Sequence, residues 1–208
     1  MTAMKKKSSV RKDNPRVVNS VLMAGVGGQG ILRASDILCL VIMAAGLDVK
    51  KSEVHGMAQR GGCVTSHVRF GPRVYSPIER KGNVDILLAF EKLESLRYLD
   101  YLKPDSRIIV NELELYPPAV NLGAMAYPAH AVELVRASFR MVKVVKAHEL
   151  AAQTGNPRVE NTVLLGVLSR WLDFEPDTWE NVLHKAFPPK ARAANIEAFH
   201  LGRNYGAA

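Results

Sequence analysis

The stretch SVLMAGVGGQG, residues 20–30, joins an apolar run to four glycines directly in front of a helical pattern. A strand, a glycine loop and a helix in this order bring backbone N–H groups within hydrogen-bonding reach of an anionic ligand. Gly25, Gly27 and Gly30 fit the GxGxxG spacing of dinucleotide-binding turns, which is a weak motif by itself. The stretch predicts either an anion-binding loop, to which Gln29 adds a side-chain amide, or a tight turn that packs the helix closely on the sheet.

A second unusual stretch, SEVHGMAQRGG at residues 52–62, follows the second predicted strand. Arg60 stands beside paired glycines, so its guanidinium and the nearby backbone donors suit a carboxylate or a phosphate. His55 can transfer a proton near neutral pH. Alternatively, Arg60 pairs with Glu53 to tie a surface loop, and composition alone favours this alternative. Together, the two stretches suggest a site where strand ends face one another.

Apolar runs alternate with helical patterns along most of the chain. The predicted strands are 16–24, 48–52, 62–70, 84–90, 107–110 and 141–145. The predicted helices between them are 31–45, 91–102 and 130–139, with a short helix from 147. Alternation of this kind favours right-handed βαβ units and a parallel sheet.

Three segments depart from this alternation. The turn at 71–73 leads into 74–76, which predicts a β-hairpin with the strand before it. Prolines between 112 and 130 predict a loop with at most one short strand. From residue 158 only helices are expected, at 159–172, 177–187 and 190–201. The predicted fold is α/β: a Rossmann-like, mostly parallel sheet flanked by helices, with a β-hairpin addition and a helical C-terminal section.

The composition is that of an ordinary globular protein. The length of 208 residues suits one well-buried domain, which we expect to span 17–208. Hydrophobic residues make up 48% and charged residues 23% of the chain. No apolar run reaches the roughly 18 residues of a membrane span, and none follows the first lysines as in a secretory signal. We therefore expect a cytoplasmic protein with no membrane partner.

Basic charge is concentrated at the N-terminus. Residues 1–16 hold six basic groups and one acidic group, which is +5 of the net charge of +8. Such a basic arm is expected to be disordered in isolation. No aromatic residues are interleaved with the charges to stack on bases, so nucleic acid is not an expected partner and nucleic-acid binding is the weakest alternative.

Several catalytic classes lack their residues in this sequence. It has no GxSxG, no Walker A lysine and no HExxH, so hydrolase and nucleoside-triphosphatase functions lack a nucleophile or a ligand set. Cys39 and Cys63 are expected to be core residues, and two thiols cannot hold an iron–sulfur cluster, which takes about four. His55, Cys63 and His67 match no metal-ligand spacing, so no metal is expected. Asn161, at a helix start, is expected to act as a cap or a core hydrogen-bonder.

A stand-alone nucleotide-binding module is the main alternative function. An NAD site of the Rossmann type has an Asp or Glu at the end of the second strand, about 20 residues after the glycines. Glu53 lies near that place, although it follows two lysines and opens a glycine-rich loop. The NAD alternative therefore stays open at the level of the sequence.

Five motifs occur in the order found in a known enzyme family. They are GVGGQG at 25–30, SEVHG with QRGG between 52 and 62, VRFG at 68–71, DILLAFE at 85–91 and ENTVLLG at 160–166. From about residue 18 to about residue 202, the chain resembles the gamma subunits and gamma domains of 2-oxoacid:ferredoxin oxidoreductases. The stretch 52–62 is most similar to the small (beta) subunits of the indolepyruvate-oxidising members.

The resemblance implies an enzyme subunit that is not active alone. Such enzymes oxidatively decarboxylate a 2-oxoacid with coenzyme A as cosubstrate, giving an acyl thioester, CO2 and reduced ferredoxin. Arylpyruvates such as indolepyruvate are the implied substrates. This chain alone would hold no cofactor, because thiamine diphosphate and iron–sulfur clusters belong to the large subunit in that family. The implied partners are this large subunit and, through the complex, ferredoxin.

The resemblance also implies which residues face the large subunit, the coenzyme or the substrate. Arg60 would neutralise an anionic group, and His55 would transfer a proton or form a hydrogen bond, so these two are the candidate catalytic residues. The implied cofactor-binding residues are Gly25, Gly27, Gly28, Gln29, Gly30, Ser52, Glu53, Gln59, Gly61 and Gly62. Cys63 stands where related chains often have a serine after the paired glycines.

Overall fold

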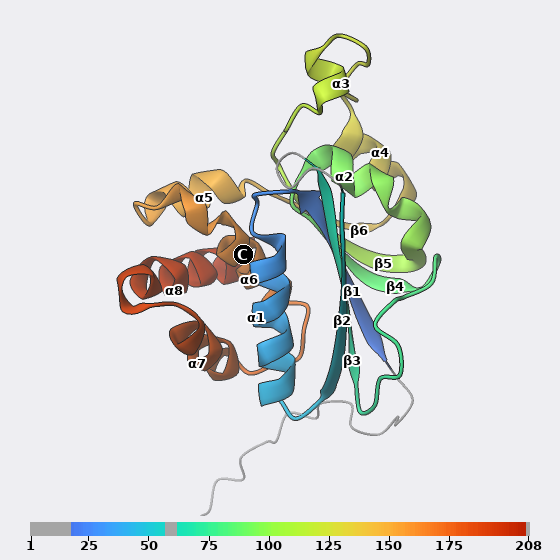
Figure 1. Ribbon diagram of the computed structural model, residues 1–208. Coiled ribbons are helices and arrows are strands. Elements are labelled where there is room, and N and C mark those ends of the chain that lie inside the picture. The colour runs from blue at the N-terminus through green and yellow to red at the C-terminus, as the bar shows by residue number, and fades with distance from the viewer. Residues whose placement is uncertain (1–17, 57–61, 207–208) are drawn as a thin grey trace, which may run out of the picture.

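The computed structural model describes residues 18–56 and 62–206, which form a sheet between two layers of helices (Figure 1). The strands are β1 (Asn19–Val26), β2 (Asp48–His55), β3 (Cys63–Gly71), β4 (Val84–Ala89), β5 (Leu102–Asn111) and β6 (Met141–Val145). One face carries α1 (Ile31–Ala44), α5 (Ala147–Gln153), α6 (Glu160–Ser169), α7 (Pro176–Ala186) and α8 (Pro189–Asn204). The other face carries α2 (Lys92–Arg97) and α4 (Ala131–Ser138), while α3 (Pro118–Asn121) lies beyond the sheet.

The strand order is β2-β3-β1-β4-β5-β6. The strands β1, β4, β5 and β6 are parallel neighbours, whereas β3 is antiparallel to both β1 and β2. This confirms the predicted Rossmann-like, mostly parallel sheet with a helical C-terminal section, and the sheet carries a β-hairpin formed by other strands than the predicted ones. The hairpin consists of β2 and β3, and β3 enters the sheet between β1 and β2. The two strands that α1 connects are therefore not neighbours.

Helix α1 forms because apolar side chains recur at helical spacing between two glycines. Gly30, just before the helix, has a left-handed φ of 78°, and Gly46, just after it, has a φ of 79°. The buried stripe includes Ile31, Ile37 and Val41, which pack in the larger of the two core clusters. Burial of each such side chain contributes about 1.5–3 kcal/mol, so this stripe fixes α1 to the sheet.

Helices α6 and α8 meet backbone to backbone at two glycines. A Cβ on Gly202 would lie 1.9 Å from the carbonyl oxygen of Val163, and one on Gly166 would lie 2.2 Å from that of Phe199. Residues 162–169 of α6 are all buried, so α6 forms the centre of the helical layer. The glycine contact therefore joins the last helix of the chain to the core.

The segment around residues 91–130 differs from the sequence prediction. Helix α2 ends at Arg97, a 3-10 turn covers Leu99–Tyr101, and β5 begins at Leu102. The observed helix α2 is thus shorter than the predicted helix 91–102. The observed strand β5 is longer than the predicted strand 107–110, and a register shift between Val84 and Ile86 of β4 accommodates its additional residues. Between 112 and 130 the chain forms the short helix α3 and no strand.

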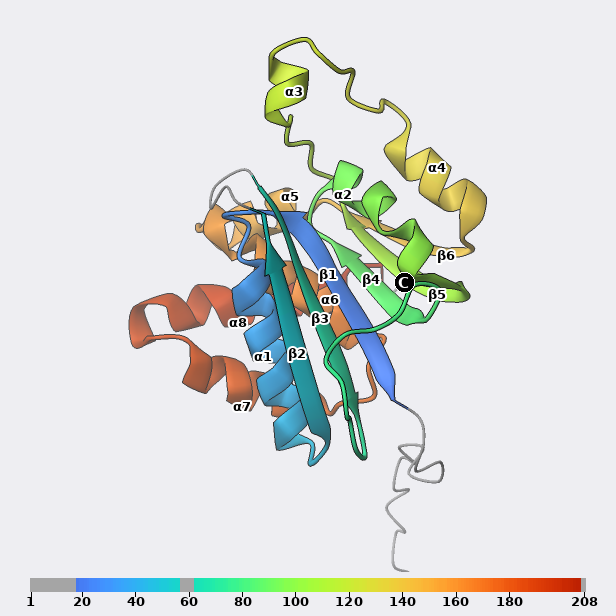
Figure 2. The same cartoon turned by 45° about the vertical axis from the view of Figure 1, so that its right-hand side comes forward.

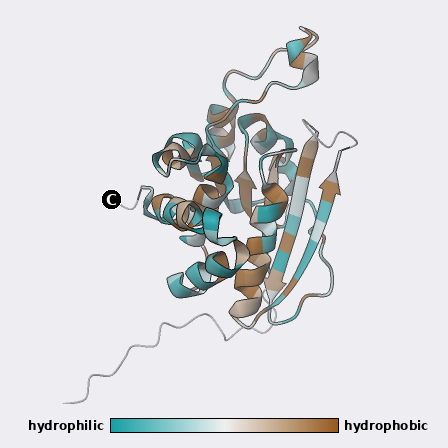
Figure 3. Ribbon diagram, turned by 60° about the vertical axis from the view of Figure 1, so that its left-hand side comes forward, coloured by the Kyte–Doolittle hydropathy of each residue, from teal (hydrophilic) through white to brown (hydrophobic). Residues whose placement is uncertain are grey.

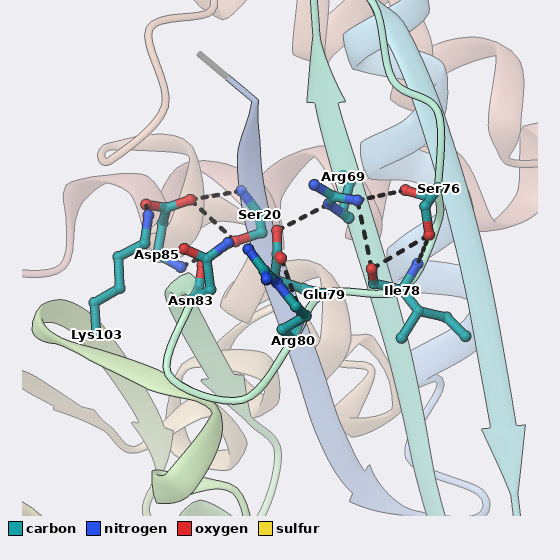
Figure 4. A network of polar contacts seen from close by, with 9 residues as sticks. All are labelled: Ser20, Arg69, Ser76, Ile78, Glu79, Arg80, Asn83, Asp85 and Lys103. Carbon is teal, nitrogen blue, oxygen red and sulfur yellow. Dashed lines mark hydrogen bonds and ion pairs between the residues drawn. The ribbon is translucent and has the colours of Figure 1, made fainter. Parts of the chain in front are cut away.

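Charged and polar side chains hold the connection between β3 and β4 (Figure 4). The Nε of Arg69 lies 2.9 Å from Oε2 of Glu79, and Arg69 donates to the carbonyl oxygen of Ser76 at 2.8 Å. Glu79 is buried, so the ion pair ties the connection to β3 at a protected position. The predicted hairpin between 62–70 and 74–76 is therefore wrong, because these contacts hold 74–76 in an irregular conformation.

Hydrophobic residues concentrate along the sheet and on the helix sides that face it (Figure 3). They form two core clusters, one on each face of the sheet. The larger cluster lies beneath α1, α6, α7 and α8, and the smaller one joins β4 and β5 to α4. Within residues 18–56 and 62–206, no helix has the length and apolar character needed to cross a membrane.

His67 is a buried histidine in the middle of β3, opposite Leu22 of β1 and Ser52 of β2. It is 7% exposed, and its Nδ1 has no hydrogen-bond partner in the described part of the chain. The edge of its ring meets Tyr101, with 5.7 Å between the ring centroids. Burial lowers the pKa of His67 below its ordinary value of 6.5, and the nearby Glu79 carboxylate only partly offsets this.

We expect the free energy of unfolding to decrease as the pH falls below about 6.5. In that range the unfolded chain binds a proton on His67 that the folded chain does not bind, whereas at higher pH the group is neutral in both states. The substitution His67→Phe keeps a ring beside Tyr101 and should remove this part of the pH dependence. Urea unfolding between about pH 5 and pH 7.5 measures it, with His184→Phe at an exposed position as the control. Equal pH slopes for wild type and H67F would contradict the prediction.

Candidate functional site

The carboxyl ends of β1, β4, β5 and β6 lie along one edge of the sheet. From β1 the chain passes through α1 toward β2, while β4 lies on the opposite side of β1 and continues toward β5. Doubly wound sheets bind ligands at such a switch point, where connections leave neighbouring strands in opposite directions. The ends of β1 and β4 are therefore the centre of the candidate site.

The glycine loop, residues 25–30, connects β1 to α1 at this switch point. Gly28 and Gly30 have φ angles of 106° and 78°, which glycine adopts without the steric cost that other residues meet. A Cβ on Gly25 would lie 2.7 Å from the Cβ of Phe90, so this glycine lets the loop pack on the end of β4. A Cβ on Gly28 would meet no atom of the described residues within 4 Å. Gly25 therefore serves packing, and the open side of the loop is at Gly28.

Backbone hydrogen bonds join the glycine loop to the end of the β2–β3 hairpin. The N–H of Gly27 donates to the carbonyl oxygen of Gly62 at 2.8 Å. The N–H of Gly56 donates to the carbonyl oxygen of Cys63 at 2.9 Å, which closes the hairpin at the same edge. The structure thus brings the two stretches together at Gly27 and Gly62, and the Gly27 amide is occupied by this contact.

Gln29 connects the two sides of the switch point through its side-chain amide. Its Oε1 accepts the Val26 N–H at 2.6 Å, and its Nε2 donates to the carbonyl oxygen of Phe90 at 2.7 Å. The N–H of Phe90 donates in turn to the carbonyl oxygen of Ala24 at 2.8 Å. The amide expected to face a ligand therefore binds the backbone of β1 and of the residue after β4. Gln29 therefore positions the loop, as in the packing alternative, and ligand binding by the loop stays a prediction.

The hairpin separates Glu53 from the glycine loop. In a Rossmann NAD site the second strand neighbours the first, so its acidic residue can reach the ribose. Here β3 lies between β1 and β2, which places β2 two strand spacings, about 10 Å, from β1. Glu53 instead pairs with Lys51, with 2.5 Å between Oε1 and Nζ. The position of Glu53 therefore argues against the NAD alternative.

The second stretch is partly strand rather than loop. Since β2 extends to His55, Ser52 and Glu53 are consecutive strand residues whose side chains lie on opposite faces of the sheet. The register of the β2–β3 pair shows that both residues belong to the strand, because Ser52 is opposite His67 and Glu53 is opposite Ser66. Only one of these two side chains can face a given side of the sheet, and cofactor binding by Ser52 and Glu53 stays a prediction. Outside the described residues lie Gln59, Arg60, Gly61 and the side chain of His55.

Cys63 belongs to a polar cluster that the sequence analysis missed. Its Sγ lies 2.9 Å from the Tyr98 hydroxyl and 3.1 Å from Oε2 of Glu94. Arg97 pairs with the other oxygen of Glu94 at 3.0 Å. Burial raises the pKa of both the Cys63 thiol and the Glu94 carboxyl. The cluster therefore ties the start of β3 to α2, and its only sequence signal was the helical spacing of Glu94, Arg97 and Tyr98.

A second polar cluster joins the ends of β4, β5 and β6. Asn111 donates to the carbonyl oxygen of Phe90 and accepts the N–H of Ala147, each at 3.2 Å. Beside it, Nδ1 of the exposed His148 lies 2.7 Å from Oε1 of Glu160, the first residue of α6. No motif marked Asn111 or His148, because their contacts depend on how separate strands end side by side.

Asn161 connects α6 to the glycine loop. Its Nδ2 lies 3.4 Å from the carbonyl oxygen of Gly30, and a Cβ on Gly30 would lie 2.6 Å from that nitrogen. This confirms the hydrogen-bonding role predicted for Asn161. The motif ENTVLLG at 160–166 thus contacts the candidate site with its first residues and α8 with its last one.

A family model described as pyruvate ferredoxin/flavodoxin oxidoreductase matches residues 20–205. The indolepyruvate oxidoreductase subunit IorB of Pyrococcus horikoshii is 37% identical over 88% of this chain and 93% of its own length. The subunit of the same name from Methanothermobacter thermautotrophicus is 32% identical over 91% of this chain and 97% of its own length. These relatives are named as subunits, and this chain spans almost their whole length.

Solved structures share the fold. The pyruvate oxidoreductase subunit PORC of Thermotoga maritima aligns with a TM-score of 0.67 at 24% identity, covering 89% of this chain and 94% of that chain. A 2-oxoglutarate:ferredoxin oxidoreductase chain of Magnetococcus marinus aligns with a TM-score of 0.70 at 22% identity, covering 91% of this chain and 31% of that longer chain. Since the family model spans the described fold and the relatives exceed 30% identity, this chain belongs to the pyruvate ferredoxin/flavodoxin oxidoreductase family.

Proposed function

We propose that this chain is the small subunit of a cytoplasmic 2-oxoacid:ferredoxin oxidoreductase that acts on arylpyruvates such as indolepyruvate. The names of relatives that share 37% and 32% of their residues with it support this substrate class. The reaction is a coenzyme A-dependent oxidative decarboxylation whose electrons pass to ferredoxin. The structural observation that supports a shared site is the contact of the glycine loop with the hairpin end, from Gly27 to Gly62, beside the switch point.

The cysteines of this chain do not fit the redox groups of such an enzyme. Cys39 and Cys63 are its two cysteines, whereas an iron–sulfur cluster takes about four. Cys39 lies on α1 and packs against the larger core cluster, where burial raises its pKa to about 11, and Cys63 contacts α2 on the opposite face of the sheet. In the described part of the chain no three His, Cys, Asp or Glu residues are grouped to hold a metal ion. We therefore assign the iron–sulfur clusters to a larger partner subunit, and the resemblance to the family assigns thiamine diphosphate to the same subunit.

The role that remains for this chain is to complete the active-site region from the edge of its sheet. The open side of the glycine loop is at Gly28, and the stretch that contains His55 and Arg60 returns to the sheet at Gly62. A guanidinium there would neutralise the carboxylate of the 2-oxoacid or a phosphate of coenzyme A. An imidazole there would exchange a proton with the reacting groups. Arg60 and His55 are the residues that we propose for these tasks.

The proposal predicts activity only when both chains are present. Co-expression with the large subunit should give a stable complex that reduces a viologen dye with indolepyruvate and coenzyme A, while either chain alone should give background rates. Activity of the isolated small chain would contradict the proposal. Calorimetry tests the alternative function, because micromolar binding of NAD to the isolated chain would favour a nucleotide-binding module.

A further inference from the structure

The segment between β5 and α4, residues 112–130, projects beyond the carboxyl edge of the sheet as an arm that carries α3 (Figures 1 and 2). The arm exposes large apolar side chains: Leu122 is 83%, Met125 is 66% and Tyr116 is 54% exposed. Helix α3 has four residues, far fewer than the roughly 12 that an isolated helix needs in water. Exposed apolar groups gathered on a projecting segment are typical of an interaction site.

A buried carboxylate holds the base of the arm. Glu91 is 1% exposed, and its Oε1 accepts the N–H of Leu115 at 3.2 Å and the hydroxyl of Tyr127. Its Oε2 accepts the N–H of Glu94 at 3.0 Å. Burial and the Glu91 carboxylate raise the pKa of Tyr127, so the hydroxyl keeps its proton. Both ends of the arm are thus tied to the start of α2, with the rings of Tyr116 and Tyr127 5.2 Å apart.

The same anchor connects the arm to the candidate site. Glu91 directly follows Phe90, whose carbonyl oxygen accepts the Gln29 amide. The N–H of Lys92 donates to the carbonyl oxygen of Leu113 at 3.0 Å, and Lys92 Nζ pairs with Glu114 at 3.1 Å. The arm and the glycine loop therefore leave one continuous edge of the sheet, joined through residues 90–92.

We propose that the arm inserts into an apolar groove of the larger subunit and thereby sets the glycine-loop edge against that subunit. This inference rests on the proposed function. The exposed parts of Tyr116, Leu122 and Met125 amount to roughly 400 Å², about half of the 800 Å² that each side of a stable interface buries. Pairing between the arms of two copies is thus too small for a stable dimer, whereas the arm together with the adjoining edge suits a larger partner.

The experiment measures how tightly the full-length small chain binds the large subunit. The double substitution Leu122→Ser and Met125→Ser should raise the Kd by about tenfold or more. The matched control is Leu40→Ser with Met43→Ser, which removes the same residue types from exposed positions on α1, across the sheet from α2. Thermal unfolding of each isolated variant shows whether it folds. Should the arm variant unfold, hydrogen exchange on the wild type replaces it, and backbone amides of 117–125 should gain protection in the complex.

Weaker binding by the arm variant alone, or protection of 117–125, supports the inference. Wild-type affinity of the arm variant, or unchanged exchange in the arm, overturns it while leaving the two-chain function intact. A dimer of the small chain that the arm variant dissociates also overturns it, because the occupant is then a second copy. If the wild-type chains form no complex at all, the proposed function fails and the assigned occupant fails with it.

Discussion

Replacement of Gly202 by alanine is expected to lower the free energy of unfolding by more than about 3 kcal/mol. The new Cβ would lie 1.9 Å from the carbonyl oxygen of Val163, and both atoms are fixed by the helix backbones. Relief of this overlap requires α8 to move away from α6. Such a movement would also shift Phe199 of α8 relative to Trp179 of α7; both rings are fully buried, and their centroids lie 5.5 Å apart.

Urea unfolding of the isolated chain measures this effect. Glu197→Ala, at an exposed position of the same helix, is the control and should change the free energy of unfolding by less than about 0.5 kcal/mol. Gly166→Ala should behave like G202A, because its Cβ would lie 2.2 Å from the carbonyl oxygen of Phe199. An unfolding midpoint of G202A equal to that of wild type would show that α6 and α8 do not pack as described.

The parts of the fold that depend on local chemistry could be predicted from the sequence. The apolar run before Gly25 and the helical stripe from Ile31 to Val41 predict β1, the glycine loop and α1, because periodicity and glycine conformation act over short distances. The alternation of strands and helices predicts a mostly parallel sheet for the same reason. That Asn161 forms a hydrogen bond could be predicted from the sequence. That its partner is the carbonyl oxygen of Gly30 could not.

The order of the strands could not be predicted, because it is decided by contacts between distant segments. The turn residues 71–73 suggest a hairpin with the strand that precedes them, but the ion pair between Arg69 and Glu79 holds the following connection in an irregular path. The strand β3 pairs instead with β2 and β1. Because β3 lies between β1 and β2, Glu53 is not near the glycine loop. No local sequence pattern predicts this insertion.

The role of Gln29 shows the same limit within the candidate site. A glutamine in a glycine loop has the donors and acceptors to bind a ligand, and the motif alone does not show where they point. Its partner is the carbonyl oxygen of Phe90, 61 residues further along the chain, which is adjacent only because β4 lies beside β1. Residues that position a loop and residues that bind a ligand can therefore have identical sequence signatures.

The substitution Gln29→Glu should lower kcat/KM of the two-chain complex about a hundredfold at neutral pH. One carboxylate oxygen can still accept the Val26 N–H, but the other would face the Phe90 carbonyl oxygen, where the amide nitrogen now donates at 2.7 Å. Loss of this donor costs about 1–3 kcal/mol in the isolated chain and releases the loop from the end of β4. Displacement of a site by about 1 Å reduces rates to this extent.

Recovery of activity at low pH distinguishes a positioning role from a general loss of stability. Once protonated, the carboxyl group that Q29E introduces carries an O–H that can donate to the Phe90 carbonyl oxygen. The ratio of variant to wild-type kcat/KM should therefore rise as the pH falls toward about 5. Gln153→Glu, an exposed substitution of the same kind on α5, should leave the ratio near one throughout. A Q29E complex as active as wild type at neutral pH would contradict the prediction. That outcome would mean that the Gln29 link between β1 and β4 is dispensable for the site, so the glycine loop would hold its position through its other contacts, among them Gly27 with Gly62 and Gly30 with Asn161.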